Sequence, residues 1–596
     1  MSVSVQSGTK VSQQEKNAVA VAGLDQDLRY VSAVKWSFRA IAVALGAAQT
    51  ILARNAMNPD GRSYLEIAQA YLHRDWSLTL STYWQPFYSW LLAAMLGITG
   101  LPPRQHFVAA HVLNFLTFLA CMAAFEFFWD SLLRYQDLKP GDVLKAGRPL
   151  PAVAMWILGY SIFIWLFIQV LIPVVGPDLA VATVVLVDAA FVLRLVGSEA
   201  PTLSQYALLG AMLGLGYLIK AILFPTAFIL LATVLVARWG KENRKRLGVT
   251  FAVFLCIAGP LVAVLSYSQR RFVFADTGKL VFAWYNYDVL NRDWEGEPPG
   301  SGTPVHTTRK VYDHPAVYEF NGPIRSSYPP WFNPAYWNEG LAPHYRPVVV
   351  AKKVVGRIGG AIRLLAEPKA LLAGVVLLFL GVDLKRTGKR ILRLWIVWLP
   401  AVAVLSLYIL TVVVPRYMPA VELLLWAGVL GGIWLKESSF CSALARWVPP
   451  LVALGLLLSV GRGMYWQVNH VREDDATPDY KTADGIKQLG LSAGAKVAAI
   501  GFNEHAYWPY LDDISIIAEI NTWDTCEFWR AAPAVQAQVL QQFVKAGAVA
   551  VVVNAGGAMM IRRIEGGPPL DLASCARPSE GWDKIPGSPN YIHFLK

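Results

Sequence analysis

Charged residues are scarce in this chain. They make up 16% of its 596 positions, whereas soluble globular proteins carry about 25%. The deficit coincides with long apolar runs that recur from Trp36 to about Gly461. A helix that crosses a bilayer needs about 20 mostly apolar residues, because hydrocarbon offers backbone amides no other partner. The sequence therefore excludes a soluble globular protein and predicts a polytopic α-helical membrane protein.

Several functional signatures are also lacking. The five cysteines show no metal-ligand spacing and the carboxylates form no such cluster, so the sequence predicts no metal site, although a requirement for a divalent metal stays open. There is neither a GxGxxG motif nor a P-loop, so no nucleotide cofactor is indicated. No cleavable signal peptide is evident, because residues 1–32 are polar and mixed in charge. We expect them to form a disordered cytoplasmic tail.

Apolar segments alternate with short basic loops over residues 33–462, the predicted transmembrane domain. The loops 134–148, 238–246 and 385–393 are strongly basic, which places them in the cytoplasm. The net charge of +12 is explained by these loops, so nucleic acid is not a predicted partner. The apolar segments lie near residues 36–54, 84–100, 107–129, 151–172, 178–196, 205–221, 222–238, 248–267, 367–383, 391–411, 415–435 and 446–462.

The three basic loops agree with one another, because even numbers of segments separate them. With the N-terminal tail inside, however, three segments precede the first basic loop, so one of them must fail to cross. The segment 84–100 is short and flanked by prolines, and we expect it to dip in from the outer face. We therefore predict about 11–13 membrane helices, of which about eleven cross. The loops 55–83 and 269–366 and everything after residue 462 then lie outside. The end of the second loop, 346–364, has the pattern of an interfacial amphipathic helix that either anchors in headgroups or binds lipid phosphate.

Residues 463–596 differ in pattern from the rest of the chain. The runs KVAAIG, ISIIAEI and AVAVVVN are typical of buried strands and alternate with helical stretches, which predicts a small extracytoplasmic α/β domain. Nothing in its sequence assigns it a function, and acceptor binding stays open. Cys526 and Cys575 are its only cysteines; outside the cell they would form a disulfide, unless they are separately buried thiols.

Polar residues at the outer ends of apolar segments are the candidates for chemistry, because ionisable groups in a membrane are costly. Asp60 follows the first segment, and Asp178 follows Pro177 at the start of a later one. For both carboxylates a helix N-cap is the structural alternative. Lys220 and Arg416 also lie at outer segment ends, where snorkelling to the interface is the alternative to binding phosphate.

Other titratable residues carry less of a functional signal. Glu126 and Asp188 lie inside apolar segments, and we expect them to form hydrogen bonds between helices. Arg194 is six residues from Asp188, too far round a helix for a clean pair. His306 and His314 have no metal-like spacing, so surface positions are favoured, with acceptor contact left open.

A set of short motifs follows one order along the outer ends of the segments. It comprises Asp60 with Tyr64, Ile67 and Ala68 on one helix; YWQPFYSWLLA at 83–93, which includes Trp84 and Gln85; Pro177-Asp178; GLGYLIKA, with Lys220; and RYMP, with Arg416 and Tyr417.

In these motifs residues 36–435 resemble the GT-C glycosyltransferases, notably the protein O-mannosyltransferases, the aminoarabinose–lipid A transferases and related bacterial family 39-like groups. The resemblance implies a GT-C fold in the inner (plasma) membrane, with the site on the extracytoplasmic face. It implies an inverting transfer of a sugar from a polyprenyl-phosphate donor to an extracytoplasmic glycan, lipid or protein. The aminoarabinose transferases carry a Lys before a Pro pair, whereas here Gln85 precedes a single Pro86, which leaves the exact donor open.

The residues suit this chemistry. Lys220 and Arg416 are expected to hold the donor phosphate, with Tyr64, Trp84, Gln85 and Tyr417 as further substrate contacts. Asp60 is expected to act as general base and Asp178 to orient the acceptor or bind a metal. A transporter or flippase of a lipid-linked saccharide is the alternative, but no internal repeat typical of transporters is found.

Overall fold

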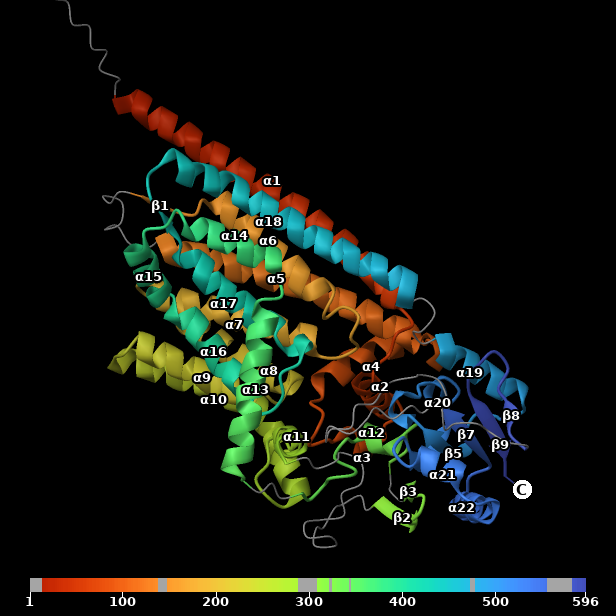
Figure 1. The fold of residues 1–596 in the computed structure, drawn as a ribbon. Helices are drawn as coiled ribbons and strands as arrows, with labels where there is room; N and C mark the ends of the chain where they lie inside the picture. The colour runs from red at the N-terminus through yellow and green to blue at the C-terminus, as the bar shows by residue number, and fades with distance from the viewer. Residues whose placement is uncertain are drawn as a thin grey trace, which may run out of the picture.

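The computed structural model describes residues 13–137, 147–287, 308–320, 324–341, 345–471, 477–554 and 581–595. A bundle of helices makes up most of the molecule, and an α/β domain adjoins one of its ends (Figure 1). The bundle helices are α1 (Gln13–Ala53), α5 (His106–Asp137), α6 (Ala152–Ile168), α7 (Asp178–Gly197), α8 (Leu203–Ile219), α9 (Leu223–Ala237), α10 (Lys241–Gln269), α14 (Lys369–Phe379), α16 (Trp395–Leu410), α17 (Pro419–Gly432) and α18 (Ser439–Trp466).

Every predicted apolar segment is helical, and most of the helices are short. Among the described residues five helices are long and apolar enough to cross a membrane, and α15 (Leu384–Arg393) with α16, bent by 68°, makes a sixth span. Six further apolar helices have 10–17 residues. At about 1.5 Å per residue, 17 residues cover about 25 Å of a hydrocarbon core about 30 Å thick. The multi-pass architecture is therefore confirmed, whereas the figure of about eleven crossings stays a prediction.

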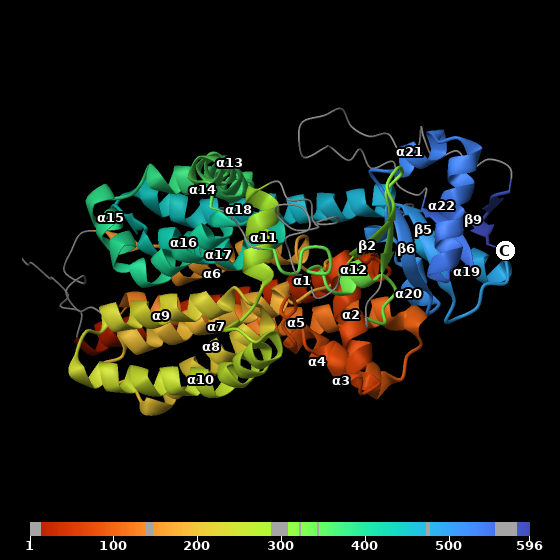
Figure 2. The same cartoon turned by 90° about the horizontal axis from the view of Figure 1, so that it is seen from below.

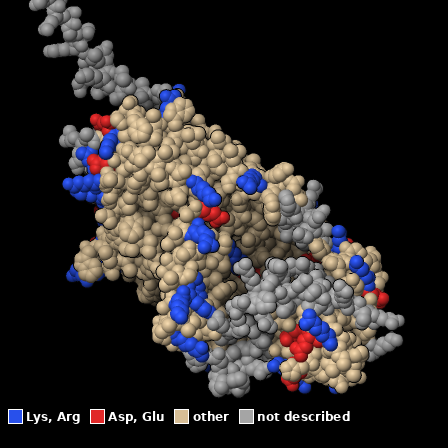
Figure 3. Space-filling model, in the orientation of Figure 1, with Lys and Arg blue, Asp and Glu red and all other residues tan. Residues whose placement is uncertain are grey.

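The described ends of the first basic loop, the connection between α9 and α10, and α15 lie at one end of the bundle, away from the α/β domain (Figure 2). At this end β1 (Arg148–Pro149) pairs with β4 (Trp434–Leu435) beside α15. Between α9 and α10, Arg238 Nη1 donates to the carbonyl of Ser198, 2.6 Å away. In Figure 3, Lys and Arg gather near this end and along α13 (Pro347–Leu365), with a largely uncharged surface between. This distribution suits a bundle with a lipid-facing belt; which end faces the cytoplasm stays a prediction.

One predicted boundary needs correction at the N-terminal side, and one predicted segment stays a prediction. Helix α1 begins at Gln13, so the tail expected to be disordered over 1–32 is helical from that residue. The reason is its content of Ala, Gln, Glu and Leu, which are strong helix formers even where no apolar stripe is present. Helix α4 (Phe87–Thr99), in the segment expected to dip in, has 13 residues, or about 20 Å of helix. It packs beside α2 (Pro59–Leu72) at the domain end of the bundle (Figure 1).

The C-terminal domain contains a seven-stranded sheet of order β2-β3-β6-β5-β7-β9-β8. The three predicted strands are present: β5 (Lys496–Gly501) runs parallel to β6 (Ser515–Asn521) and β7 (Ala550–Asn554). The edges are antiparallel: β9 (Tyr591–Phe594) pairs with β7 and β8 (Asp583–Lys584). The helices of this region are α19 (Thr477–Gln488), α20 (Trp508–Leu511), α21 (Thr525–Arg530) and α22 (Pro533–Ala546).

The long outer loop supplies part of this sheet, which the predicted boundary at residue 463 missed. The hairpin of β2 (Thr308–Tyr312) and β3 (Val317–Phe320) comes from the loop and pairs with β6 through β3. Pairing between strands about 200 residues apart leaves no local pattern in the sequence. The alternation of apolar and polar side chains can indicate a strand, but it does not indicate with which strand it pairs. The loop and the domain therefore form one structural unit.

The rest of the outer loop is helical in part. It contains α11 (Thr277–Asn286) and α12 (Pro329–Phe332), and it ends in α13, which lies across the bundle helices in Figures 1 and 2. Arg357 fastens α13 to the bundle, because its guanidinium donates to Asn286 Oδ1 and to the carbonyls of Tyr285 and Leu410. In the domain, Cys526 is disulfide-bonded, and Cys575, its predicted partner, lies outside the described residues.

Candidate functional site

Asp60 occupies the first turn of α2. Its N-terminal neighbour Pro59 stands at the first helical position, where a missing N–H costs nothing. Asn58, not Asp60, is the N-cap residue, so capping does not account for the carboxylate. Its position still favours a negative charge, since the first turn is the positive end of the helix dipole. Asp178 similarly follows the N-cap Pro177 in the first turn of α7.

Four of the predicted site residues meet in one ionic cluster at the domain end of the bundle. Arg416 lies in the short turn Pro415–Tyr417 between α16 and α17. Its Nη2 is 2.5 Å from Asp60 Oδ2, and its Nε is 3.9 Å from Asp178 Oδ2. Lys220, directly after α8, forms an ion pair with Asp178 Oδ1. Two cations and two carboxylates, brought from four separate parts of the chain, thus balance one another.

The cluster is sheltered but open to approach. The exposed fractions of the side chains are 20% for Asp60, 26% for Arg416, 22% for Lys220 and 8% for Asp178. A site of this kind can exchange one anion for another, because each cation keeps an accessible edge.

Tyr417 forms one wall of the cluster. Lys220 Nζ lies 3.9 Å from the centre of its ring, a cation–π contact. The ring also stacks on Tyr408 of α16, with centroids 5.2 Å apart. The Tyr417 hydroxyl accepts a hydrogen bond from Arg416 Nη2 at 3.4 Å. The predicted Arg-Tyr pair therefore contributes a charge and an aromatic face to the same site.

The carboxylates control the electrostatics. Burial lowers the pKa of the Arg416 guanidinium, but Asp60, Tyr417 and Asp178 raise it by more, and the net shift is upward. The pKa of Tyr64 is raised well above its usual value by burial and then by Asp60. The pKa of Tyr83 rises for the same two reasons. Arg416 is thus firmly cationic and these two phenols are neutral, so charge at the site is carried by the four-residue cluster.

Three other predicted substrate contacts, Tyr64, Trp84 and Gln85, are buried side chains. Tyr64, on α2 one turn after Asp60, is buried against Trp84, with ring centroids 4.9 Å apart. Trp84 Nε1 donates to the carbonyl of Phe332 in α12, 3.0 Å away. Gln85 is 2% exposed, and neither of its amide atoms finds a hydrogen-bond partner among the described residues. The structure places these three in a buried wall, and their contact with a substrate stays a prediction.

Two residues near the cluster were not singled out from the sequence. Tyr83 belongs to the aromatic-Pro motif, and the pKa of its phenol is raised by burial and then by Asp60. Tyr285 comes from α11 of the outer loop, and the pKa of its phenol is raised by burial and then by Tyr417. Tyr83 could have been found from its motif, whereas no local pattern marks Tyr285.

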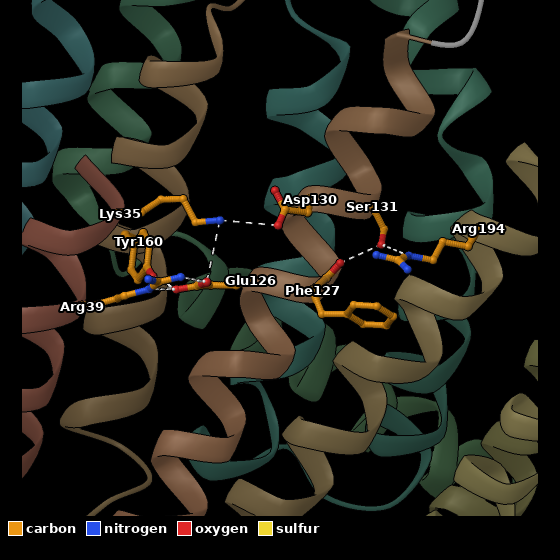
Figure 4. Close-up of polar contacts among 8 residues, drawn as sticks. All are labelled: Lys35, Arg39, Glu126, Phe127, Asp130, Ser131, Tyr160 and Arg194. Carbon is orange, nitrogen blue, oxygen red and sulfur yellow. Dashed lines mark hydrogen bonds and ion pairs between the residues drawn. The ribbon is translucent and has the colours of Figure 1, made fainter. Parts of the chain in front are cut away.

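A second polar cluster lies inside the bundle and confirms the structural role expected for Glu126. Arg39 of α1 donates to both carboxylate oxygens of Glu126 on α5, at 2.6 and 2.5 Å (Figure 4). Tyr160 of α6 also donates to Glu126, and Lys35 lies 3.4 Å from Asp130. These contacts pair opposite charges between α1 and α5 and add a hydroxyl from α6, as buried ionic groups in a membrane require.

Asp188 is not part of that network. It is 3% exposed, and its Oδ1 has no hydrogen-bond partner among the described residues, so the bond between helices that we expected for it is not made through this atom. Arg194 instead donates to Ser131 Oγ at 2.8 Å (Figure 4), which agrees with the expectation that Arg194 and Asp188 do not pair.

The remaining candidates concern metals and histidines. No group of three or more His, Cys, Asp or Glu side chains able to hold a metal ion occurs in the described parts of the chain. His314 lies on the surface, with its Nδ1 3.4 Å from Glu527 Oε1. His306 lies outside the described residues.

Comparisons with known proteins complete the description. No family model matches the chain, and no curated protein does. Among solved structures it is similar to ArnT from Cupriavidus metallidurans in the apo state, with 14% identity, a TM-score of 0.38, and 92% of this chain and 100% of that chain covered. The same protein bound to undecaprenyl phosphate gives 14% identity, a TM-score of 0.38, and coverages of 87% and 93%. The apo oligosaccharyltransferase from Archaeoglobus fulgidus gives 13% identity, a TM-score of 0.45, and coverages of 87% and 69%. Likenesses of this extent leave the chemistry to be argued from the chain's own contacts.

Proposed function

We propose that this chain is a membrane glycosyltransferase of the GT-C type, which moves a sugar from a polyprenyl-phosphate donor to an extracytoplasmic acceptor. One observation carries the proposal. Arg416 and Asp60, 356 positions apart, are joined in an ion pair beside Asp178 and Lys220. The site thus holds two cations that can bind a phosphate and two carboxylates that can contact an acceptor hydroxyl. This is the set of groups that transfer from a lipid phosphate requires.

The two cations are assigned to the donor. Arginine presents a planar fork that matches phosphate oxygens, and lysine adds a compact charge. Both side chains are partly exposed at the domain end of the bundle. A polyprenyl chain in the surrounding lipid can bring its phosphate to this level, so the membrane itself is a partner of the reaction.

The chemical step follows from these positions. The acceptor hydroxyl oxygen attacks the anomeric carbon, and its proton passes to the Asp60 carboxylate acting as general base. The bond between the anomeric carbon and the phosphate oxygen breaks, and its electron pair leaves with the polyprenyl phosphate. Lys220 and Arg416 stabilise that leaving phosphate. Attack opposite the leaving group inverts the anomeric centre. Asp178 orients the acceptor or, if a divalent ion takes part, is one of its ligands.

Asp60 must first be released from Arg416. In the present structure the guanidinium holds Oδ2 of Asp60. Arg416 is therefore not free to bind the donor phosphate, and Asp60 is not free to accept the proton of the acceptor hydroxyl. A donor phosphate that binds Arg416 takes over this contact and leaves the carboxylate free to accept a proton. Binding of the donor and activation of the base are thereby coupled through a single arginine.

A transporter or flippase of a lipid-linked saccharide is the second candidate. Substrate sites of such proteins lie near the bilayer midplane, between repeated halves. Here the ionic cluster lies at the end of the bundle beside the α/β domain, between α2, α7, the end of α8 and the turn before α17. That location favours a reaction at the membrane surface over passage through it.

Transfer by the purified protein tests the proposal. The protein is reconstituted in nanodiscs and supplied with radiolabelled polyprenyl-phosphate sugars and with extracted envelope lipids, glycans and proteins as acceptors. We expect label to move to one acceptor fraction, and to stay on the donor when Arg416→Gln protein is used. Translocation of the labelled lipid in sealed vesicles without any transfer would overturn the proposal in favour of the flippase.

A further inference from the structure

Asn58 forms a reciprocal pair of hydrogen bonds with the backbone of Val175. Its Nδ2 donates to the carbonyl of Val175 at 3.1 Å, and its Oδ1 accepts from the N–H of Val175 at 3.0 Å. Asn58 is the N-cap residue of α2, yet its side chain makes no capping bond to the helix. The side-chain amide instead forms hydrogen bonds with another segment of the chain, 117 positions away.

The two joined segments are those that carry the carboxylates. Asn58 stands two residues before Asp60, and Val175 stands three residues before Asp178. The Asn58–Val175 pair therefore fixes the start of α2 against the start of α7. Through it the spacing of Asp60 and Asp178 is held by neutral hydrogen bonds from a side chain to the backbone, independently of the ion pairs to Arg416.

A glycine provides a second, independent sign of this close approach. A Cβ atom added to Gly61, which follows Asp60, would stand 2.7 Å from Val175 Cβ and 2.8 Å from Met57 Sδ. Val175 is fully buried, so it cannot easily move aside. A residue larger than glycine would push the two segments apart.

Neutral side chains of α4 and α5 hold the same two segments from behind. Asn114 Nδ2 donates to the carbonyl of Val174 at 2.8 Å, and its Oδ1 accepts from the Tyr88 hydroxyl at 2.8 Å. His111 Nε2 donates to the carbonyl of Ala56 at 2.9 Å. The framework that supports the carboxylates is thus made of uncharged hydrogen bonds.

We propose that Asn58 is a positioning residue, which keeps the Asp60 and Asp178 carboxylates in register when their ion pairs are exchanged for substrate. This inference rests on the proposed function. Two neighbouring carboxylates repel each other once a phosphate takes their cations. Hydrogen bonds between neutral groups do not depend on that charge balance. Only a carboxamide of this reach offers both the donor and the acceptor that Val175 needs.

Two variants test the proposal through different atoms. Asn58→Ala removes both hydrogen bonds, and Gly61→Ala separates the segments without removing a polar group. We expect each to lower kcat by about 10- to 100-fold, since displacements of about 1 Å from the reacting geometry have costs of that order. The Kd for undecaprenyl phosphate should stay within about threefold of wild type, because Lys220 and Arg416 are untouched. Asn469→Ala, which removes a side-chain bond on the surface after α18, serves as the matched control.

Further measurements distinguish positioning from a loss of folding. In an Asp178→Asn background the effect of Asn58→Ala should shrink, because only one carboxylate is left to be spaced. Val175→Gly should restore part of the activity of Gly61→Ala by making room for the added methyl group. A kcat above about half of wild type in both single variants would overturn the proposal, as would equal losses with and without Asp178. If Asp60→Asn abolishes transfer while these variants remain active, the proposed function stands and only the inference fails.

Discussion

Arg416 Nη2 lies 2.5 Å from Asp60 Oδ2, and the same guanidinium faces Asp178, with its Nε 3.9 Å from Oδ2. One arginine thus connects the two carboxylates that are assigned to the acceptor. The expected ligand of Arg416 is the donor phosphate. Binding of the donor must therefore replace at least one of the contacts that Arg416 makes with Asp60 and Asp178. The first predictions follow from this competition.

Asp60→Asn should abolish transfer and leave the protein folded. Loss of a general base costs about 10² to 10⁴ in rate. A lost N-cap would instead cost about 1 kcal/mol of stability, but here Asn58 holds the N-cap position. Turnover and Tm of the purified variant decide between the two. Retention of more than about a tenth of wild-type turnover, with an unchanged Tm, would rule out the catalytic role.

The same variant should bind undecaprenyl phosphate more tightly. Removing the Asp60 charge frees Arg416 for the lipid phosphate, and a charge-assisted hydrogen bond contributes about 1.5–3 kcal/mol, equivalent to about a tenfold or larger decrease in Kd. Titration of wild-type and Asp60→Asn protein in nanodiscs measures it. Arg416→Gln is the counter-variant and should weaken binding; an unchanged Kd in Asp60→Asn would contradict the competition between carboxylate and phosphate.

Tyr417→Leu should weaken donor binding more than it slows the chemical step. The ring lies 3.9 Å from Lys220 Nζ, and cation–π contacts contribute about 0.5–2 kcal/mol. We expect the donor KM to rise by about two- to thirtyfold, with kcat changed less. Tyr417→Phe keeps the ring face and should stay close to wild type, so equal losses in the Phe and Leu variants would show that the hydroxyl is the group that matters.

Cysteine labelling tests the orientation. With native Cys256 replaced, a cysteine introduced at Gly141 should react only with reagents that reach the cytoplasm, because the described ends of the basic loops share one end of the bundle. A cysteine at exposed Ser492 of the C-terminal domain should react from outside. Labelling of position 141 by an impermeant external reagent would reverse the topology.

Asp479 should make the stability of the C-terminal domain sensitive to pH. Burial raises its pKa to about 6, although the N–H groups of Tyr507 and Trp508 donate to it. A carboxyl group with a raised pKa stabilises the fold while it is protonated, and this contribution is lost as pH rises through about 6. Asp479→Asn should therefore raise the Tm at pH 8 and change it little near pH 4. A Tm difference independent of pH would contradict this origin.

The ionic cluster was predictable residue by residue but not as an arrangement. Asp60, Asp178, Lys220 and Arg416 each stand at the outer end of an apolar segment, and the end of a segment is visible in the sequence because hydropathy changes there. Which ends come together was not visible. The pairings Asp60–Arg416 and Asp178–Lys220 depend on how α2, α7, α8 and the turn before α17 pack.

The parts that were missed share a cause. The β2–β3 hairpin joins a sheet whose other strands lie far along the chain, and the carbonyl of Tyr285 in the outer loop accepts a hydrogen bond from Arg357 of α13. In both cases the contact is between segments distant in sequence, so no local periodicity reports it. The early start of α1 is different: helix propensity was present in residues 13–32, but the polarity of the segment argued for disorder.

By itself the sequence determined that this chain is a multi-pass helical protein, that an α/β domain follows the bundle, and that polar candidates stand at the ends of apolar segments. These are local properties, set by hydropathy and by the alternation of strands and helices. Only the tertiary structure decided that Arg416 bridges Asp60 and Asp178, and that Asn58 and Gly61 bring the two carboxylate-bearing segments into close contact at Val175. Those relationships arise because segments that are remote in sequence pack together. The hydrogen-bond and ion-pair partners are far apart along the chain, so no single stretch of sequence contains both.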